Sequence, residues 1–200
     1  MARTRSDHYA ENQQLILERA AELFARQGFA RTSIAEVARA CAFSKAWIYH
    51  YYASKEAILY ALLKAHIAEL RRVSKAALKV NEQPMHRFRA FIAANLEVYA
   101  RAPHKHLVLM NELDHLAPEQ AEEIRELERE LVDLVVGLLL DLNPGLAPHA
   151  NLRKPYAMML YGLINWTYVW YDPKGAVAPE RLAELAADLF LHGFLSQPRQ

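Results

Sequence analysis

The stretch Thr32–Glu56, TSIAEVARACAFSKAWIYHYYASKE, constrains the fold most, because it reads as two short helices joined by a tight turn. Ser33 and Glu36 have the spacing of a capping box, in which each residue's side chain accepts the other's backbone N–H. Apolar residues then recur at helical spacing until the turn, after which Ser44 is the expected N-cap of the second helix. Ser54 begins a third, long helix. The stretch therefore predicts a helix-turn-helix.

Two helices joined in this way suit DNA, because the second helix can enter the major groove. Its side chains then meet base edges, while hydroxyls, amides and cations hold the flanking phosphates. The second helix here, SKAWIYHYY, is basic and aromatic. From the residues alone, a generic helical hairpin with aromatic core residues is an equally good interpretation.

Residues 10–60 resemble the DNA-binding domain of the TetR family of transcriptional repressors. The resemblance rests on the segments AAELFARQGFARTSIAEVA and FSKAWIYHYYASKEAIL. Residues at family-typical positions are Tyr49, His50, Tyr52, Ser54, Lys55 and Glu56. The resemblance implies an all-α fold, with a three-helix DNA-binding domain and a six-helix C-terminal domain for ligand binding and dimerisation. We place these domains at residues 1–55 and 56–200.

The resemblance implies a homodimer that binds a two-fold symmetric double-stranded operator, with hydroxyls and cations on phosphates and the second helix on bases. The candidate DNA-binding residues are Arg3, Arg5, Thr32, Ser33, Ser44, Lys45, Ala46, Trp47, Tyr49, His50 and Lys55. Residues 1–9 are polar and are predicted to be a disordered tail, with a basic arm as the alternative.

Three residues depart from the family pattern. The family usually has glycine in the turn at Ala42, and often at Ala46. Because alanine with a positive φ costs about 1 kcal/mol, we expect an ordinary turn conformation at Ala42. Trp47 stands where a small residue is common, so it must lie along the groove or pack on a thymine methyl or a sugar.

Charge is distributed unevenly although the net charge is only +1. Residues 1–80 contain 13 Lys+Arg and 7 Asp+Glu, whereas residues 81–200 contain 11 and 16. A basic first part and an acidic remainder suit a DNA reader joined to a body that does not bind DNA. The chain has one cysteine, no signal peptide pattern and no apolar run long enough for a bilayer, so a cytoplasmic protein without membrane contact is predicted.

Proline and glycine mark the breaks between the remaining helical patterns, and no strand alternation occurs. Outside the helix-turn-helix, the predicted helices are 11–27, 54–80, 85–101, 103–116, 118–142, 152–171 and 179–195. The last two are expected to pair with their two-fold mates, as the resemblance implies.

The segment MMLYGLINWTYVWYDPKG holds more aromatic residues than one interface stripe needs. A dimer and domain core is the favoured interpretation, and the alternative is an apolar pocket with Asn165 as its polar contact. The candidate effector-binding residues are Phe88, Phe91, Ile92, Asn95, Tyr99, Leu107, Met110, Asn111, Met158, Tyr161, Asn165, Trp166 and Trp170.

The pattern INW…WY followed by DPKG is similar to a subset of TetR-type regulators that respond to acyl-CoA thioesters. A hydrophobic drug, an aromatic metabolite or a free fatty acid is an open alternative. Candidate cations for the CoA phosphates are Arg87, Arg89, Arg101, Lys105 and Arg153.

The chain shows no arrangement of nucleophile and base and no phosphate-binding glycine loop, so we predict no enzyme activity and no cofactor. A metal site is also not predicted, although histidines and carboxylates gather at His104, His106, Glu112, Asp114 and His115. The leading hypothesis is a transcriptional regulator, most often a repressor, released from its operator by a small apolar or aromatic effector. The alternative is a DNA-binding dimer without an effector.

Overall fold

The computed structural model describes residues 5–79 and 83–195, and within these ranges the chain is helical with no β-strand. It forms two compact units, Met1–Ile67 with His104–Ile124 and Ala68–Pro103 with Arg125–Gln200. This confirms the predicted all-α fold. The assignment of DNA binding to residues 1–55 and of effector binding and dimerisation to residues 56–200 is a functional division and stays a prediction.

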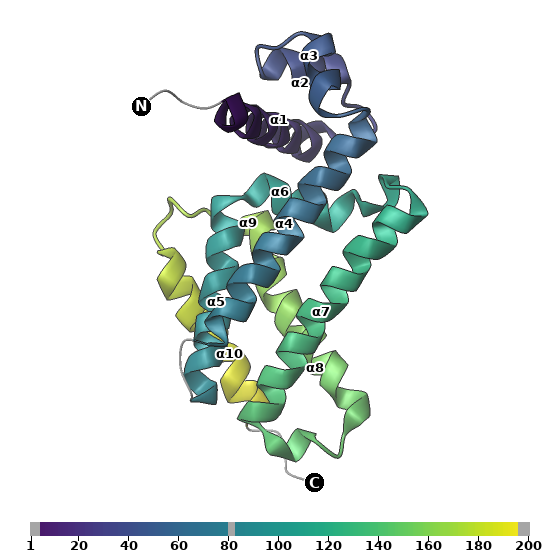
Figure 1. Cartoon of the computed structure of the whole chain (residues 1–200). Coiled ribbons are helices and arrows are strands. Elements are labelled where there is room, and N and C mark those ends of the chain that lie inside the picture. The colour runs from purple at the N-terminus through teal and green to yellow at the C-terminus, as the bar shows by residue number, and fades with distance from the viewer. Residues whose placement is uncertain (1–4, 80–82, 196–200) are drawn as a thin grey trace. The chain divides into compact units, whose positions relative to one another are not determined.

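The first unit is built around the helix-turn-helix (Figure 1). Its elements are α1 (Arg5–Gln27), α2 (Ile34–Ala40), α3 (Lys45–Tyr51), most of α4 (Lys55–Ala77), α6 (Pro103–Asn111), the 3-10 helix η1 (Leu113–His115) and the start of α7 (Pro118–Leu142). The side chains of Phe24 on α1, Ile48 on α3 and Ile58 on α4 are fully buried in its core.

The first helix is longer than predicted. It begins at Arg5, whereas the apolar pattern placed its start at Glu11, so residues 5–9 are helical and not part of a disordered tail. Residues 5–9 are mostly polar, so the apolar spacing does not extend to them. Helix propensity alone is too weak a signal to place the start of the helix there. Arg3 lies outside the described residues, and Arg5 is described only by its backbone.

The turn between α2 and α3 is a Schellman motif built on an alanine. The N–H of Phe43 donates to the carbonyl of Ala38 at 2.8 Å, and the N–H of Ala42 donates to that of Arg39 at 3.1 Å. Ala42 has a φ of 56°, so the expectation of an ordinary conformation was wrong. Satisfying both carbonyls of the helix end outweighs the steric cost of the left-handed backbone.

Replacing Ala42 with glycine is therefore expected to raise the free energy of unfolding by about 1 kcal/mol, because the Cβ strain disappears. Urea denaturation followed by circular dichroism measures the change. The control is Ala46→Gly on the exposed face of α3, where φ is helical and glycine should lower stability by up to about 1 kcal/mol. Destabilisation by both substitutions would contradict the predicted strain.

The second unit contains α5 (Pro84–Arg101), the last parts of α4 and α7, the 3-10 helix η2 (Pro144–Leu146), α8 (Ala150–Asn165), α9 (Thr167–Trp170) and α10 (Pro179–Leu195). Helix α10 packs along α5, with Phe190 against the fully buried Phe88 at 5.6 Å between ring centroids (Figure 1). This packing places α10, the last helix of the chain, along α5.

Two predicted helices are divided in the structure. The helix predicted at 152–171 breaks at Trp166, and the Thr167 hydroxyl donates to the carbonyl of Ile164 at 2.7 Å. Such local side-chain bonds compete with the regular helix. The helix predicted at 103–116 ends as α6 at Asn111 and continues as η1, which frees Glu112 for a tertiary contact described below.

Cys41 is buried at the end of α2, with 5% of its surface exposed. Burial raises the pKa of its thiol to about 11, so the thiol is protonated and unreactive at neutral pH. Among the described residues, none of the helices combines the length and apolar character that crossing a membrane requires.

Candidate DNA-binding surface and effector site

Helix α3 presents a basic and aromatic face to solvent. Ile48 is fully buried and Tyr52, the C-cap residue, is 9% exposed, so these two side chains fix the rotation of the helix. The predicted DNA-binding residues of this helix are all exposed: Lys45, Ala46, Trp47, Tyr49 and His50. A short helix held by its opposite side, with a cation and three rings exposed, fits a recognition helix.

Serine side chains begin both helices of the motif. The Ser44 hydroxyl accepts the N–H of Trp47 at 3.1 Å, and Ser33 forms the predicted capping box with Glu36. A hydrogen bond from the Ser33 hydroxyl, followed by one from the Ser33 backbone, lowers the pKa of Glu36 to about 2. Both serines thus have a structural role here, and their contact with phosphates stays a prediction.

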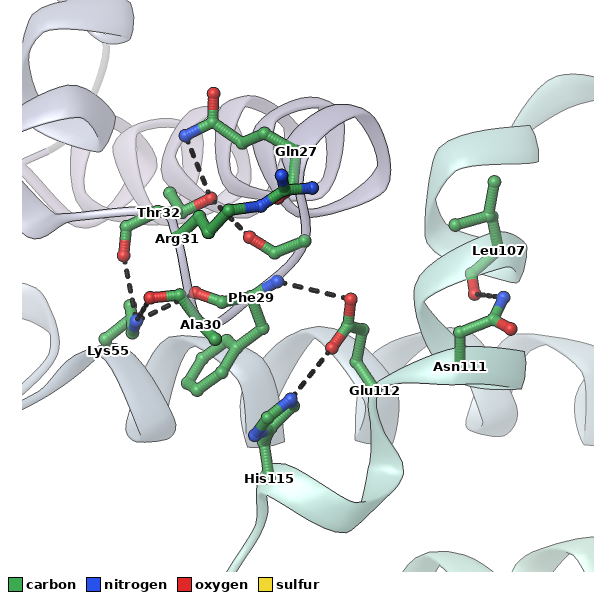
Figure 2. A network of polar contacts seen from close by, with 11 residues as sticks. Gln27, Phe29, Ala30, Arg31, Thr32, Lys55, Leu107, Asn111, Glu112 and His115 are labelled. Carbon is green, nitrogen blue, oxygen red and sulfur yellow. Dashed lines mark hydrogen bonds and ion pairs between the residues drawn. The ribbon is translucent and has the colours of Figure 1, made fainter.

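Thr32, a predicted phosphate contact, forms hydrogen bonds within the protein. Its side chain is buried, with 2% of the residue exposed. The hydroxyl donates to the carbonyl of Gly28 at 2.9 Å and accepts from the amide of Gln27 at 3.2 Å (Figure 2). These bonds close the loop between α1 and α2, and the contact of Thr32 with a phosphate stays a prediction.

Lys55, whose contact with the DNA backbone stays a prediction, is hydrogen-bonded to the loop between α1 and α2. Its ammonium group donates to the carbonyls of Phe29 and Thr32, each at 2.8 Å, and of Ala30 at 3.4 Å (Figure 2). The same group lies 4.2 Å from the centre of the Phe29 ring, within range of a cation–π interaction. An ammonium has three donors, and the loop uses all of them. Lys55 therefore holds the loop to α4.

Glu112 holds the same loop from another element. One carboxylate oxygen accepts the N–H of Phe29 at 3.2 Å, and the other lies 3.2 Å from Nε2 of His115 (Figure 2). The His115 ring also packs on that of Phe29, with centroids 4.9 Å apart. Sequence reasoning considered Glu112 and His115 only as metal ligands and missed this contact, because it joins residues 83 positions apart.

Two buried histidines face each other between α4 and α6. His66 is 3% exposed and His106 is 1% exposed, with Nε2 of His66 at 3.3 Å from Nδ1 of His106. Burial, and secondarily the charge of His66, lowers the pKa of His106 to about 3. Sequence analysis missed His66, although its position four residues after Leu62 continued the apolar stripe of α4 and could have revealed it.

In the second unit, the effector candidates on α5 are buried, and their part in an effector site stays a prediction: Phe88, Phe91, Ile92, Asn95 and Tyr99. The polar groups among them are hydrogen-bonded within the protein. The Asn95 amide donates to the Ser74 hydroxyl at 3.1 Å, and the Tyr99 hydroxyl donates to Oδ1 of Asn165 at 2.7 Å. The structure thus brings Tyr99 and Asn165 together.

The effector candidates on α8 and α9 divide into two groups. Tyr161 is buried, donates to the carbonyl of Leu131 at 3.0 Å and packs edge-on against Phe91. Met158, Trp166 and Trp170 are instead 50–60% exposed, so within one chain they do not form buried walls of a pocket. This exposure favours an intermolecular surface for these three residues.

The effector candidates Leu107, Met110 and Asn111 belong to α6, in the first unit. Leu107 and Met110 are half-buried, and the exposed Asn111 donates its amide to the carbonyl of Leu107. Their part in an effector site stays a prediction.

Several cations proposed for CoA phosphates already have partners in the second unit. Arg87 pairs with Asp141, Arg89 with Asp188 and Arg101 with Glu69, and Arg153 donates to the carbonyl of Ala147. Each of these contacts uses one terminal nitrogen of the guanidinium, so a phosphate would share the cation with the present partner or replace that partner.

The fold and the exposed face of α3 define a helix-turn-helix DNA-binding protein. Residues 16–62 match the family described as bacterial regulatory proteins, tetR family, and residues 81–194 match the tetracyclin repressor-like C-terminal domain. The chain belongs to the TetR family of DNA-binding transcriptional regulators.

Relatives agree with this assignment. A TetR-family regulator from Bordetella parapertussis 12822 is 40% identical, with a TM-score of 0.88, 93% of this chain and 97% of that chain being covered. The HTH-type transcriptional repressor KstR2 of Rhodococcus jostii is 23% identical over 90% of each protein. The regulator YuxN of Bacillus subtilis is 45% identical over 53 residues, and the chain spans only 18% of that relative's length.

One structural neighbour is a ternary complex. AibR, solved with isovaleryl coenzyme A and operator DNA, has a TM-score of 0.76 at 23% identity, with 89% of this chain and 97% of AibR covered. At this identity the similarity establishes a shared fold.

Proposed function

We propose that this protein is a homodimeric, ligand-responsive transcriptional repressor that acts in the cytoplasm and inserts α3 of each protomer into successive major grooves of a two-fold symmetric operator. The exposed face of α3, with Lys45, Trp47, Tyr49 and His50, carries the proposal. Lys45 in the first turn and His50 in the last turn are both exposed, whereas Ile48 between them is fully buried. Side chains in this position can reach base edges and the adjacent phosphates.

The exposed apolar residues of α8 to α10 support the dimer. This dimer face comprises Met158, Met159, Trp166, Val169, Trp170, Leu185 and Leu189, each 44–68% exposed in the single chain. Large exposed apolar patches of this kind mark interaction surfaces. A two-fold partner that packs its own α8 and α10 on this face would remove it from water.

Alanine substitution at Lys45 or at His50 is expected to weaken operator binding at least tenfold, because a cation or a base-edge contact is lost in both half-sites. The operator is first selected from random duplexes with the full-length dimer, and affinities are then measured at one fixed salt concentration. The control is Lys79→Ala, an exposed lysine outside the helix-turn-helix. Full affinity of both α3 variants would overturn the assignment of α3.

For the effector, we propose an acyl-CoA thioester. Its support is the INW…WY and DPKG pattern, together with the fold shared with AibR, which was solved with isovaleryl coenzyme A. Binding would shift the population toward a state whose recognition helices no longer fit the operator, which requires tighter binding to that state. The Tyr99–Asn165 hydrogen bond favours the alternative, a body that only dimerises, because these polar groups are already paired with each other.

A thermal-shift titration distinguishes a protein that binds an acyl-CoA effector from a dimer without an effector. Ligand that binds only the folded state raises the melting temperature in a dose-dependent way. We expect a rise with one chain-length class of acyl-CoA and none with free CoA. Operator binding is then repeated with that compound. A response to fatty acids or aromatic acids alone would replace the acyl-CoA assignment, and no response to any compound would favour the effector-free dimer.

A further inference from the structure

We propose that Trp47 reads a thymine of the operator through its C5-methyl group, and that an aromatic stack anchored on α1 by Tyr9 holds the indole in place. The inference rests on the proposed function and names what one residue of α3 recognises. It adds Tyr9, Tyr51 and Asn12 to the residues on which operator recognition depends.

The indole of Trp47 is held from one side and open on the other. Its ring stacks on the imidazole of His50, with centroids 5.5 Å apart and an interplanar angle of 23°. Phe43 approaches edge-on at 6.3 Å, from the turn before α3. Even so, Trp47 remains 44% exposed. One large apolar surface is therefore presented in a defined orientation on the face of α3 that meets DNA.

The stack continues to the first helix. Tyr51 contacts the rings of both Trp47 and His50 edge-on, at 5.8 Å and 5.3 Å. Tyr9 of α1 stacks on Tyr51 at 4.6 Å and meets His50 edge-on at 6.1 Å. The amide of Asn12, also on α1, donates to the Tyr51 hydroxyl at 2.9 Å. The rotamers of the two exposed rings are thus tied to a helix outside the turn.

The chemistry of indole limits what Trp47 can recognise. Its ring nitrogen is a single donor with no acceptor, so it cannot make the bidentate contacts that select guanine or adenine. The one apolar group that distinguishes a base in the major groove is the thymine C5-methyl. A fixed, exposed ring surface matches that group. A pair of stacked rings also loses less conformational freedom on binding than a flexible side chain would.

Uracil substitution in the operator tests the contact directly, since it removes only the methyl group and keeps every hydrogen-bonding edge. The selected operator is synthesised with each half-site thymine replaced in turn by uracil. We expect one position to weaken wild-type binding about fourfold per half-site, the value for losing one buried methyl group. Trp47→Ala should bind the thymine and uracil operators equally. The contact would be overturned if no uracil substitution weakened binding by the wild type. It would also be overturned if uracil weakened binding by Trp47→Ala as much as by the wild type.

The position of the stack is tested by Tyr9→Ala and by the conservative Tyr9→Phe. We expect Tyr9→Ala to weaken binding to the operator about tenfold while binding to random duplexes is unchanged. The loss of affinity caused by uracil substitution should also be smaller in this variant than in the wild type. Tyr9→Phe keeps the ring and should retain the wild-type ratio. Circular dichroism checks folding, and Tyr9→Leu replaces Tyr9→Ala if α1 is disturbed. If Tyr9→Ala or Tyr9→Leu kept the wild-type ratio of operator to random-duplex affinity, the positioning role of Tyr9 would be overturned.

These outcomes are distinct from failure of the proposed function. If no duplex is selected by the full-length protein, the assignment of α3 to DNA fails. If an operator is selected and bound but shows no methyl dependence, only the reading by Trp47 fails.

Discussion

Replacing Lys55 with methionine is expected to lower the free energy of unfolding by about 3 kcal/mol, the largest effect we predict for a single side chain of the helix-turn-helix. The loss combines three charge-assisted hydrogen bonds to the 29–32 loop with a cation–π contact on Phe29. Methionine keeps the apolar length of the side chain but leaves these carbonyls without their donor. Urea denaturation of the full-length protein gives the change.

The matched control for this substitution is Lys75→Met on the same helix. Lys75 is exposed and lies 3.4 Å from Glu130, an arrangement that contributes at most about 1 kcal/mol. Lys55→Arg gives a second comparison, because the planar guanidinium cannot direct three donors at three carbonyls in the way an ammonium does. If Lys55→Met cost no more than Lys75→Met, the hydrogen bonds of Lys55 to the loop would not be a major contribution to stability.

Acidification is expected to destabilise the protein through His106. Its pKa is about 3 in the folded state, against 6.5 for the ordinary side chain, so the unfolded chain binds a proton that the folded chain rejects. The contribution of neutral His106 to the free energy of unfolding is therefore fully present above about pH 6.5. It is lost progressively as the pH decreases from 6.5 toward 3. Between pH 7 and pH 5 the loss amounts to about 2 kcal/mol.

The measurement is urea denaturation at several pH values, with His106→Gln as the reference protein. Glutamine does not titrate, so the difference between the two stability curves isolates the histidine from the carboxylates. We expect the wild-type advantage to shrink with acidification over this window. Parallel curves for the two proteins would show that His106 does not take part in the pH dependence.

The same histidine pair lies between α4 and α6, while Glu112 of the following segment holds the 29–32 loop. Both contacts lie inside the first unit, which contains the helix-turn-helix. Substitutions at His106 should therefore be examined for operator binding as well as for stability, since one element carries both contacts.

Local signals were sufficient for the recognition motif. Ser33, Ser44 and Ser54 begin helices as predicted, and Gly28 ends α1 with a φ of 84°. Trp47 and His50, which the resemblance assigned to DNA contact, are exposed in the structure. Caps and amphipathic periods act within a few residues of the chain, so the sequence by itself determines them.

Hydrogen bonding in the folded chain decided the rest, over short separations for Thr32 and Ala42 and over long ones for Lys55 and the histidine pair. The hydrogen bonds of Thr32 to Gly28 and of Lys55 to the 29–32 loop were not predicted, and the phosphate contacts of both residues stay predictions. The left-handed φ of Ala42 and the pairing of His66 with His106 could not be read from local preference. A side-chain donor bonds the acceptor that the fold places nearest to it. A strained backbone conformation persists where it allows the carbonyls at a helix end to be hydrogen-bonded. Only the packed chain determines which acceptors are near and which strain is compensated.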